Sequence, residues 1–219
     1  MSEHVVRAAA PRLPWLTLTS AGAALALAAA AIAPLELAYV PSAPSLGRLL
    51  GCHFVHFSTQ HLLWDVLTFA TVSACVERRL PRQHALFLGS AVFVVPPAAC
   101  ALTPWVRAYA GLSGLVLGQL AMLLATRLRV AAVMRSPART IGYVASLAIL
   151  LVKQCYEYRV GNTSLVTMDY RGFATVPAAH LVSVLVGILV GALGAPVTTG
   201  PRCVTVNWAS KRTYAGVTK

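Results

Sequence analysis

Six long runs of apolar residues follow one another along the chain, and short polar segments separate them. A membrane-spanning helix needs about 20 apolar residues, because about 30 Å of hydrocarbon is crossed at about 1.5 Å per residue. The pattern therefore predicts six transmembrane helices. They cover residues 15–32, 61–76, 85–102, 108–126, 140–153 and 176–194. Arg7 and Arg12 precede the first run, so a signal peptide is the alternative there, although the apolar stretch is long for one.

The composition agrees with a chain that lies mostly inside a membrane. Of the 219 residues, 58% are hydrophobic and only 11% are charged, and the mean hydropathy is +0.71. A soluble domain carries about 25% charged residues, so this chain has too few to cover its surface in water. We predict an all-α membrane protein, a six-transmembrane-helix bundle over residues 1–195. A basic cytoplasmic tail, residues 196–219, follows and is expected to be mobile at the lipid headgroups.

The net charge of +12 predicts an orientation in the lipid bilayer and no nucleic-acid partner. Basic residues lie between the apolar runs instead of forming one patch. Six spans place both termini on one side, and with the termini inside, the inner segments hold 13 of the 18 Lys and Arg residues. Cytoplasmic segments of membrane proteins carry an excess of Lys and Arg, so we expect both termini to be cytoplasmic.

Polar residues recur near the outer ends of the second, fourth and sixth predicted spans. The second span opens with His61, and Asp65 follows four residues later on the same helical face. Ser113 lies five residues inside the fourth span, at a depth of about 8 Å. His180 lies four residues inside the sixth, at about 6 Å. Each residue alone fits a role in helix packing, but polar groups at similar depth on three helices predict a functional site.

Small residues around Ser113 and His180 predict close packing of their two helices. The serine stands in GLSG, between Gly111 and Gly114, and glycines there leave amide N–H groups free to hold an anion. His180 shares a helical face with Gly187 and further small residues. Close packing would bring His180 Nε2 within hydrogen-bond reach of Ser113 Oγ. The pattern indicates a nucleophile and its general base.

Other chemistries find little support in the sequence. The HExxH pattern of zinc proteases is absent, and Asp65 is the one aspartate in a predicted span, whereas aspartyl proteases need two. Five cysteines without a CxxC pair argue against a zinc site or a disulfide framework, and whether any of them pair stays open. We expect no metal and no cofactor. A solute transporter is disfavoured because transporter sites lie near the midplane of the membrane.

At these residues the sequence resembles the rhomboid intramembrane serine proteases. That family pairs a GxSG serine on its fourth span with an AH histidine on its sixth, and here GLSG holds Ser113 and AAH holds His180. Its second span begins with a histidine, and another histidine stands five residues upstream, which His61 and His56 match. The ERR stretch at residues 77–79 is similar to the segment that follows the family's second span.

The resemblance implies a mechanism and a class of substrate. Ser113 would attack a peptide carbonyl with His180 as its base, and the oxyanion would lie at the Ser113 amide, His61 and the position of Asp65. The residues expected to support the site are Arg48, His56, Gly111, Gly114 and Gly187. The loop over residues 156–175 would cap the site. Substrates would be transmembrane or membrane-anchored proteins, cut near the outer face of the membrane.

The compact length is most similar to the bacterial rhombosortase subgroup of that family. This resemblance implies a protein of the bacterial inner membrane whose active site opens to the outer side. It also implies substrates cut near a C-terminal Gly-Gly sorting helix.

Four positions depart from the family pattern. Asp65 replaces an asparagine, Gly47 replaces a tryptophan, Leu117 stands where an aromatic or histidine ring would stack on the base, and Ser183 replaces a glycine. An ionised Asp65 would repel an oxyanion, so it helps only when protonated or when turned to orient His61. These departures favour the alternative, a catalytically inactive rhomboid-like protein that binds transmembrane helices.

Overall fold

The computed structural model describes residues 13–161 and 176–194. Within these ranges the protein has eight helices and no β-strand, which confirms the all-α prediction there. The helices are α1 (Trp15–Ala29), α2 (Pro34–Leu37), α3 (Leu46–Gly51), α4 (Thr59–Arg79), α5 (Pro81–Leu102), α6 (Ser113–Val133), α7 (Pro137–Val160) and α8 (Pro177–Leu193). The predicted tail, residues 196–219, lies outside the described residues.

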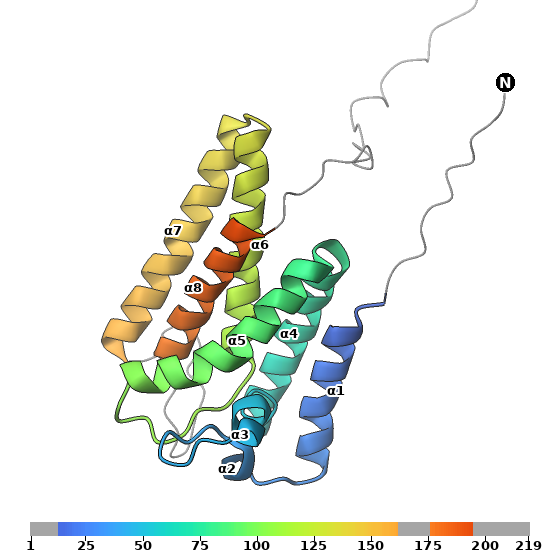
Figure 1. The fold of residues 1–219 in the computed structure, drawn as a ribbon, viewed down its shortest axis with the longest axis vertical. Helices are drawn as coiled ribbons and strands as arrows, with labels where there is room; N and C mark the ends of the chain where they lie inside the picture. Colours follow the sequence, from blue (N-terminus) through green and yellow to red (C-terminus); the bar gives the residue numbers. More distant parts are fainter. Residues whose placement is uncertain (1–12, 162–175, 195–219) are drawn as a thin grey trace, which may run out of the picture.

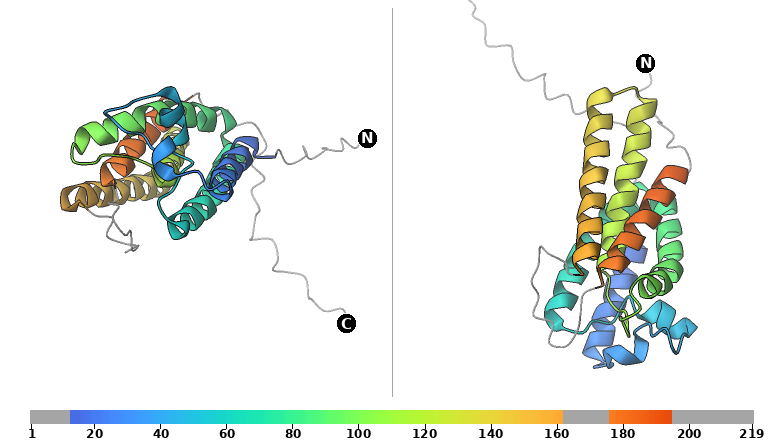
Figure 2. Two further views of the ribbon diagram at one scale, coloured as in Figure 1. Left: turned by 90° about the horizontal axis from the view of Figure 1, so that it is seen from below. Right: turned by 90° about the vertical axis from the view of Figure 1, so that its left-hand side faces the viewer.

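The six long helices run alternately up and down, and α2 and α3 lie at the end where α6 and α8 begin (Figure 1). Helix α6 packs against α4, α5, α7 and α8, so it forms the centre of the bundle, and α1 packs against α4. Figure 2 shows α7 and α1 at opposite sides of this arrangement. The bundle therefore holds the start of α6 and the start of α8 at the same end.

Three of the helices, α5, α6 and α7, are long and apolar enough to cross a membrane. Helices α1 and α8 are shorter apolar helices of 15 and 17 residues. Helix α4 has 21 residues and carries two arginines in its last turn. The prediction of six membrane spans thus agrees with six long helices, and the number that cross the bilayer stays a prediction.

The start of the fourth long helix was predicted wrongly. Helix α6 begins at Ser113, not at residue 108, so Ser113 is its first residue and does not lie five residues inside it. The preceding segment pairs with other backbone instead of coiling. Tyr109 exchanges two backbone hydrogen bonds with Tyr39, each 2.9 Å, and the Gly111 N–H donates to the Cys52 carbonyl at 2.9 Å. These bonds hold the segment extended until the helix starts.

Glycines form the seam between α6 and α8, as the small-residue pattern predicted. A Cβ added to Gly187 would overlap the backbone carbonyl group of Gly118, with the carbonyl carbon at 2.8 Å. A Cβ on Gly191 would lie 2.5 Å from the Met122 carbonyl oxygen. A Cβ on Gly114 would meet Ser183 Oγ at 3.0 Å. At Gly187 and Gly191 the two helix backbones approach so closely that a side chain does not fit without a shift.

A carboxylate at the far end of α4 fixes helix α1. Glu77 accepts hydrogen bonds from the backbone N–H groups of Leu16 and Thr17, both at 2.9 Å, and from Thr17 Oγ at 2.7 Å. The first N–H groups of a helix have no partner within the helix, so this carboxylate supplies the cap that Pro14 cannot. Glu77, in the ERR stretch, therefore helps to dock α1 onto α4.

Candidate active site

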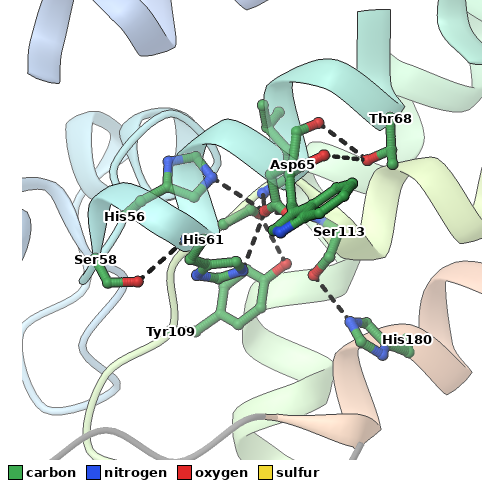
Figure 3. Close-up of polar contacts among 11 residues, drawn as sticks. His56, Ser58, His61, Asp65, Thr68, Tyr109, Ser113 and His180 are labelled. Atoms are coloured by element: carbon green, nitrogen blue, oxygen red, sulfur yellow. Dashed lines mark hydrogen bonds and ion pairs between the residues drawn. The ribbon is translucent and has the colours of Figure 1, made fainter. Parts of the chain in front are cut away.

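The structure places the side chains of Ser113 and His180 in direct contact. Ser113 Oγ lies 2.9 Å from His180 Nε2, and both residues stand in the first turn of their helices (Figure 3). The close α6–α8 seam produces this distance, as the sequence predicted. The other ring nitrogen, His180 Nδ1, is buried and has no hydrogen-bond partner among the described residues. The pair therefore has the geometry of a nucleophile and its base, and no acid meets the second nitrogen within the part of the chain that the structure describes.

Asp65 turns its carboxylate toward the backbone at the start of α6. Its Oδ2 atom accepts hydrogen bonds from the N–H groups of Leu112, at 2.9 Å, and of Ser113, at 3.1 Å. The Nε2 atoms of His56 and His61 lie 3.0 Å and 3.2 Å from the same oxygen (Figure 3). The expectation that amides beside the glycines can hold an anion agrees with these two bonds, but the anion is a side chain of the protein itself. That amide has a partner, and the partner is Asp65.

The two histidines of the second-span motif both face this carboxylate. Asp65 is the i+4 neighbour of His61 on α4, and the position of the ring beside the carboxylate agrees with the idea that Asp65 orients it. His56 was expected to support the site, and its Nε2 pairs with Asp65. The two imidazole rings meet edge to face, with centroids 5.1 Å apart. Ser58 holds the start of α4 by accepting the His61 N–H at 3.1 Å.

Gly111 has a backbone conformation that other residues rarely adopt, with φ of +120°. A Cβ there would lie 3.1 Å from His61 Cε1 and 3.2 Å from Asp65 Oδ2. This conformation brings the next two amides, those of Leu112 and Ser113, onto the same oxygen. Successive N–H groups turned to one side form a concave anion site, or nest. A glycine is therefore required at Gly111 for two reasons: its φ is positive, and His61 and Asp65 leave little space for a Cβ.

Arg48, predicted to support the site, lies in α3 and faces the surface loop before that helix. Its Nη1 donates to the Ala43 carbonyl at 3.5 Å, and no described contact joins it to Ser113 or His180. The expected role beside the site is not seen because the short helix α3 directs this side chain away from it. Gly47 precedes it on an open face, with nothing within 4 Å of an added Cβ.

Two further departures from the family pattern lie on the α6–α8 side of the site. Leu117 packs with a small apolar cluster that includes Leu150 and Val184, so no ring stacks on His180 from this position. Ser183 is buried and faces Gly114 across the seam. The predicted cap over residues 156–175 lies mostly outside the described residues, and its first residues form the last turn of α7.

The roles of Tyr109 and of the Leu112 amide were not predicted from the sequence. Tyr109 is buried, meets His53 edge to face with ring centroids 5.8 Å apart, and directs its hydroxyl to the Gly111 carbonyl at 3.4 Å. Burial lowers the pKa of His53 to about 4, so this ring is neutral packing in the connection before α4. A backbone amide has no side-chain signature, so only the glycine pattern pointed to this segment.

The described residues contain no group of three or more His, Cys, Asp or Glu side chains arranged to hold a metal ion. Cys52, Cys75, Cys100 and Cys155 are free thiols in the same part of the chain. The described residues at the site offer the following groups for chemistry. These are a serine hydroxyl on an imidazole, beside a set of N–H donors that hold a carboxylate oxygen.

Comparison with known proteins agrees with this geometry. The rhomboid domain matches residues 43–197, which is well over half of the chain and includes α3 to α8. A comparison with curated proteins finds no match. The matched region holds both the dyad and the donors around Asp65. The chain belongs to the rhomboid family.

Proposed function

We propose that this protein is an intramembrane serine endopeptidase that cleaves membrane-anchored proteins through Ser113 and His180. The observation that carries the proposal is the distance of 2.9 Å between Ser113 Oγ and His180 Nε2. That distance lies within the hydrogen-bond reach required of a nucleophile and its general base. Membership of the rhomboid family supports it, because members of that family are generally proteases of this kind.

In the proposed mechanism, His180 Nε2 accepts the Ser113 proton while Oγ attacks the substrate carbonyl carbon. The carbonyl oxygen becomes an oxyanion, and the nearest donors for it are the Ser113 amide and His61 Nε2. His180 then gives its proton to the leaving amine, which leaves an acyl-enzyme on Ser113. A water molecule, activated by the same imidazole, hydrolyses the ester and restores the serine.

The proposal includes an orientation and a type of substrate. Both termini are cytoplasmic, which follows from the excess of Lys and Arg in the inner segments. The starts of α6 and α8 then face the outer side, most simply of a bacterial inner membrane, and water reaches the dyad from there. The resemblance to the rhombosortase subgroup leads us to include as substrate a protein with a C-terminal Gly-Gly motif, a hydrophobic helix and basic residues.

A second candidate function is that of an inactive rhomboid-like protein that binds transmembrane helices. The observation that favours it is the hydrogen bond that the Ser113 amide donates to the Asp65 carboxylate. Two negative oxygens about 3 Å apart repel by about 5 kcal/mol at an effective dielectric constant of about 20. An oxyanion cannot form readily beside that carboxylate while Asp65 keeps its position, so activity depends on whether it moves.

Labelling with a fluorophosphonate probe tests the proposed function on the purified full chain in detergent. We expect the probe to label the protein, and Ser113→Ala and His180→Ala to abolish labelling. Ser146→Ala is the matched control, because its exposed hydroxyl bonds only the Gly142 carbonyl of its own helix. A Gly-Gly reporter substrate gives a second readout, in which cleavage depends on Ser113. Labelling that survives Ser113→Ala would refute the dyad, and no labelling of any variant would favour the inactive binder.

A further inference from the structure

Four hydrogen-bond donors surround a single oxygen of Asp65. The amides of Leu112 and Ser113 donate to Oδ2 at 2.9 Å and 3.1 Å, and backbone N–H groups can only donate, so this oxygen is an acceptor. Nε2 of His56 and of His61 complete the set at 3.0 Å and 3.2 Å. The side chain of Asp65 is 7% exposed, so water does not compete strongly for that oxygen. We call these four donors the cage.

The cage has the composition of an oxyanion site. Such sites place the amide of the nucleophile and a second donor on the oxygen that becomes negative during attack. Here the Ser113 amide belongs to the residue whose Oγ lies on His180, and His61 Nε2 supplies a side-chain donor. The oxygen now held by the cage is the negatively charged oxygen of the protein itself. In Figure 3 the dashed lines from the cage converge on Asp65, beside the Ser113–His180 bond.

We propose that Asp65 Oδ2 occupies the oxyanion site of the resting protein, and that a substrate carbonyl must displace it before Ser113 is acylated. This inference rests on the proposed protease function. Asp65 then acts as an internal competitor for the cage and sets the rate of acylation. It takes no part in bond making, because among the described residues the hydrogen-bond partner of Ser113 Oγ is His180 and not Asp65.

Space at the cage supports competition between one oxygen and another. A Cβ on Gly111 would lie only 3.2 Å from Asp65 Oδ2 and 3.1 Å from His61 Cε1, so the cage is closed on the Gly111 side. The two amides donate from consecutive residues and converge on one point. A carbonyl oxygen can use these donors only after Oδ2 has left. Asp65 lies in the second turn of α4, so we expect rotation of its side chain to open the cage.

A purely structural role for Asp65 is the competing explanation. In that case the carboxylate only ties the segment before α6 to α4, and its loss would disturb the dyad. The two roles predict opposite changes in the reactivity of Ser113. An internal competitor slows acylation, so its removal accelerates labelling. A structural tie preserves the dyad, so its removal slows labelling.

The experiment measures the second-order rate constant of fluorophosphonate labelling for wild type, Asp65→Asn and Asp65→Ala in the full chain. Each protein is also measured with the additional substitution Ser113→Ala, and that background rate is subtracted. We expect Asp65→Asn, which keeps the shape and removes the charge, to label at least ~10-fold faster than wild type, because a charge-assisted hydrogen bond is about twice as strong as a neutral one. Thermal unfolding of each variant confirms that it is folded.

Formate supplies an independent readout on Asp65→Ala. This small carboxylate should enter the vacated cage and slow Ser113-dependent labelling of Asp65→Ala, while wild type, whose cage is filled, is unaffected. Formamide, which has the same shape without the charge, is the control and should have little effect. If both folded variants label no faster than wild type and formate does not slow Asp65→Ala, the inference is overturned while the protease function stands. If no protein labels through Ser113, the proposed function itself fails.

Discussion

The α6–α8 seam allows a sharp test of how helix packing positions the dyad. Gly187 lies on α8 seven residues after His180, and the backbone of Gly118 on α6 is directly opposite. In Gly187→Ala the added Cβ would lie 2.8 Å from the Gly118 carbonyl carbon and 3.1 Å from its Cα, and closer still to its carbonyl oxygen. Carbon atoms in ordinary contact stand about 3.5–4.0 Å apart. The helices must therefore separate by about 1 Å at this point.

The expected effect on stability is smaller than the effect on activity. Overpacking in a close interface costs about 1–3 kcal/mol. The change from glycine to alanine within a helix returns up to about 1 kcal/mol through higher helix propensity. The net loss is therefore about 0–2 kcal/mol. A shift of about 1 Å would lengthen the bond of 2.9 Å between Ser113 Oγ and His180 Nε2 beyond hydrogen-bond range. A displacement of that size costs about 100-fold in rate.

The assay is the rate of fluorophosphonate labelling at a temperature where the variant is folded, together with thermal unfolding. Gly89→Ala on α5 is the control, because nothing lies within 4 Å of its added Cβ. We expect Gly89→Ala to label like wild type and Gly187→Ala to lose about 100-fold. Wild-type labelling by a folded Gly187→Ala would refute the claim that this seam sets the dyad distance.

Two further substitutions test the backbone around the site and the docking of α1. Gly111→Ala places a Cβ 3.1 Å from His61 Cε1 at a φ of +120°, so it should cost about 1–3 kcal/mol of stability and abolish labelling. Gly161→Ala shares a positive φ but has open space, so it should cost stability alone; equal labelling by the two would contradict this. Glu77→Gln weakens the cap of α1 and should lower stability by about 1 kcal/mol, read as a lower unfolding temperature, whereas Glu36→Gln, on an exposed side chain, should not.

The long helices could be predicted from the sequence because apolar length alone determines them. Helices α5, α7 and α8 contain or closely follow the predicted runs. The start of α6 could not be predicted in this way. Residues 108–112 are apolar enough to extend the run, but the backbone bonds from Tyr109 and Gly111 to distant segments hold them outside the helix. Hydropathy does not predict such backbone hydrogen bonds, because their partners lie in chain segments more than 50 residues away.

The dyad could be predicted from the sequence because its geometry depends on a periodic feature. Glycines at helical spacing on two spans predict a close seam, and a close seam brings together the residues at the starts of both helices. Arg48 and His56 had no such periodic constraint. Arg48 lies on the short helix α3 and His56 in the connection before α4, where one bond to Ala43 or to Asp65 decides the direction of the side chain. The positions of Arg48 and His56 in the family motif therefore did not predict which residues they bond.

Asp65 is partly predictable from the sequence and partly not. The sequence identifies it as a carboxylate where the related proteins have a neutral donor, and a carboxylate can only accept when it is ionised. Its partners, however, are two backbone amides, which every residue carries, so the sequence does not show that they point at it. If the proposed protease function holds, the same amides must serve the oxyanion, so a well-formed bond between Ser113 and His180 is necessary for activity without being sufficient. In that proposal the rate depends on the competition between the carboxylate oxygen and the substrate carbonyl for one set of donors.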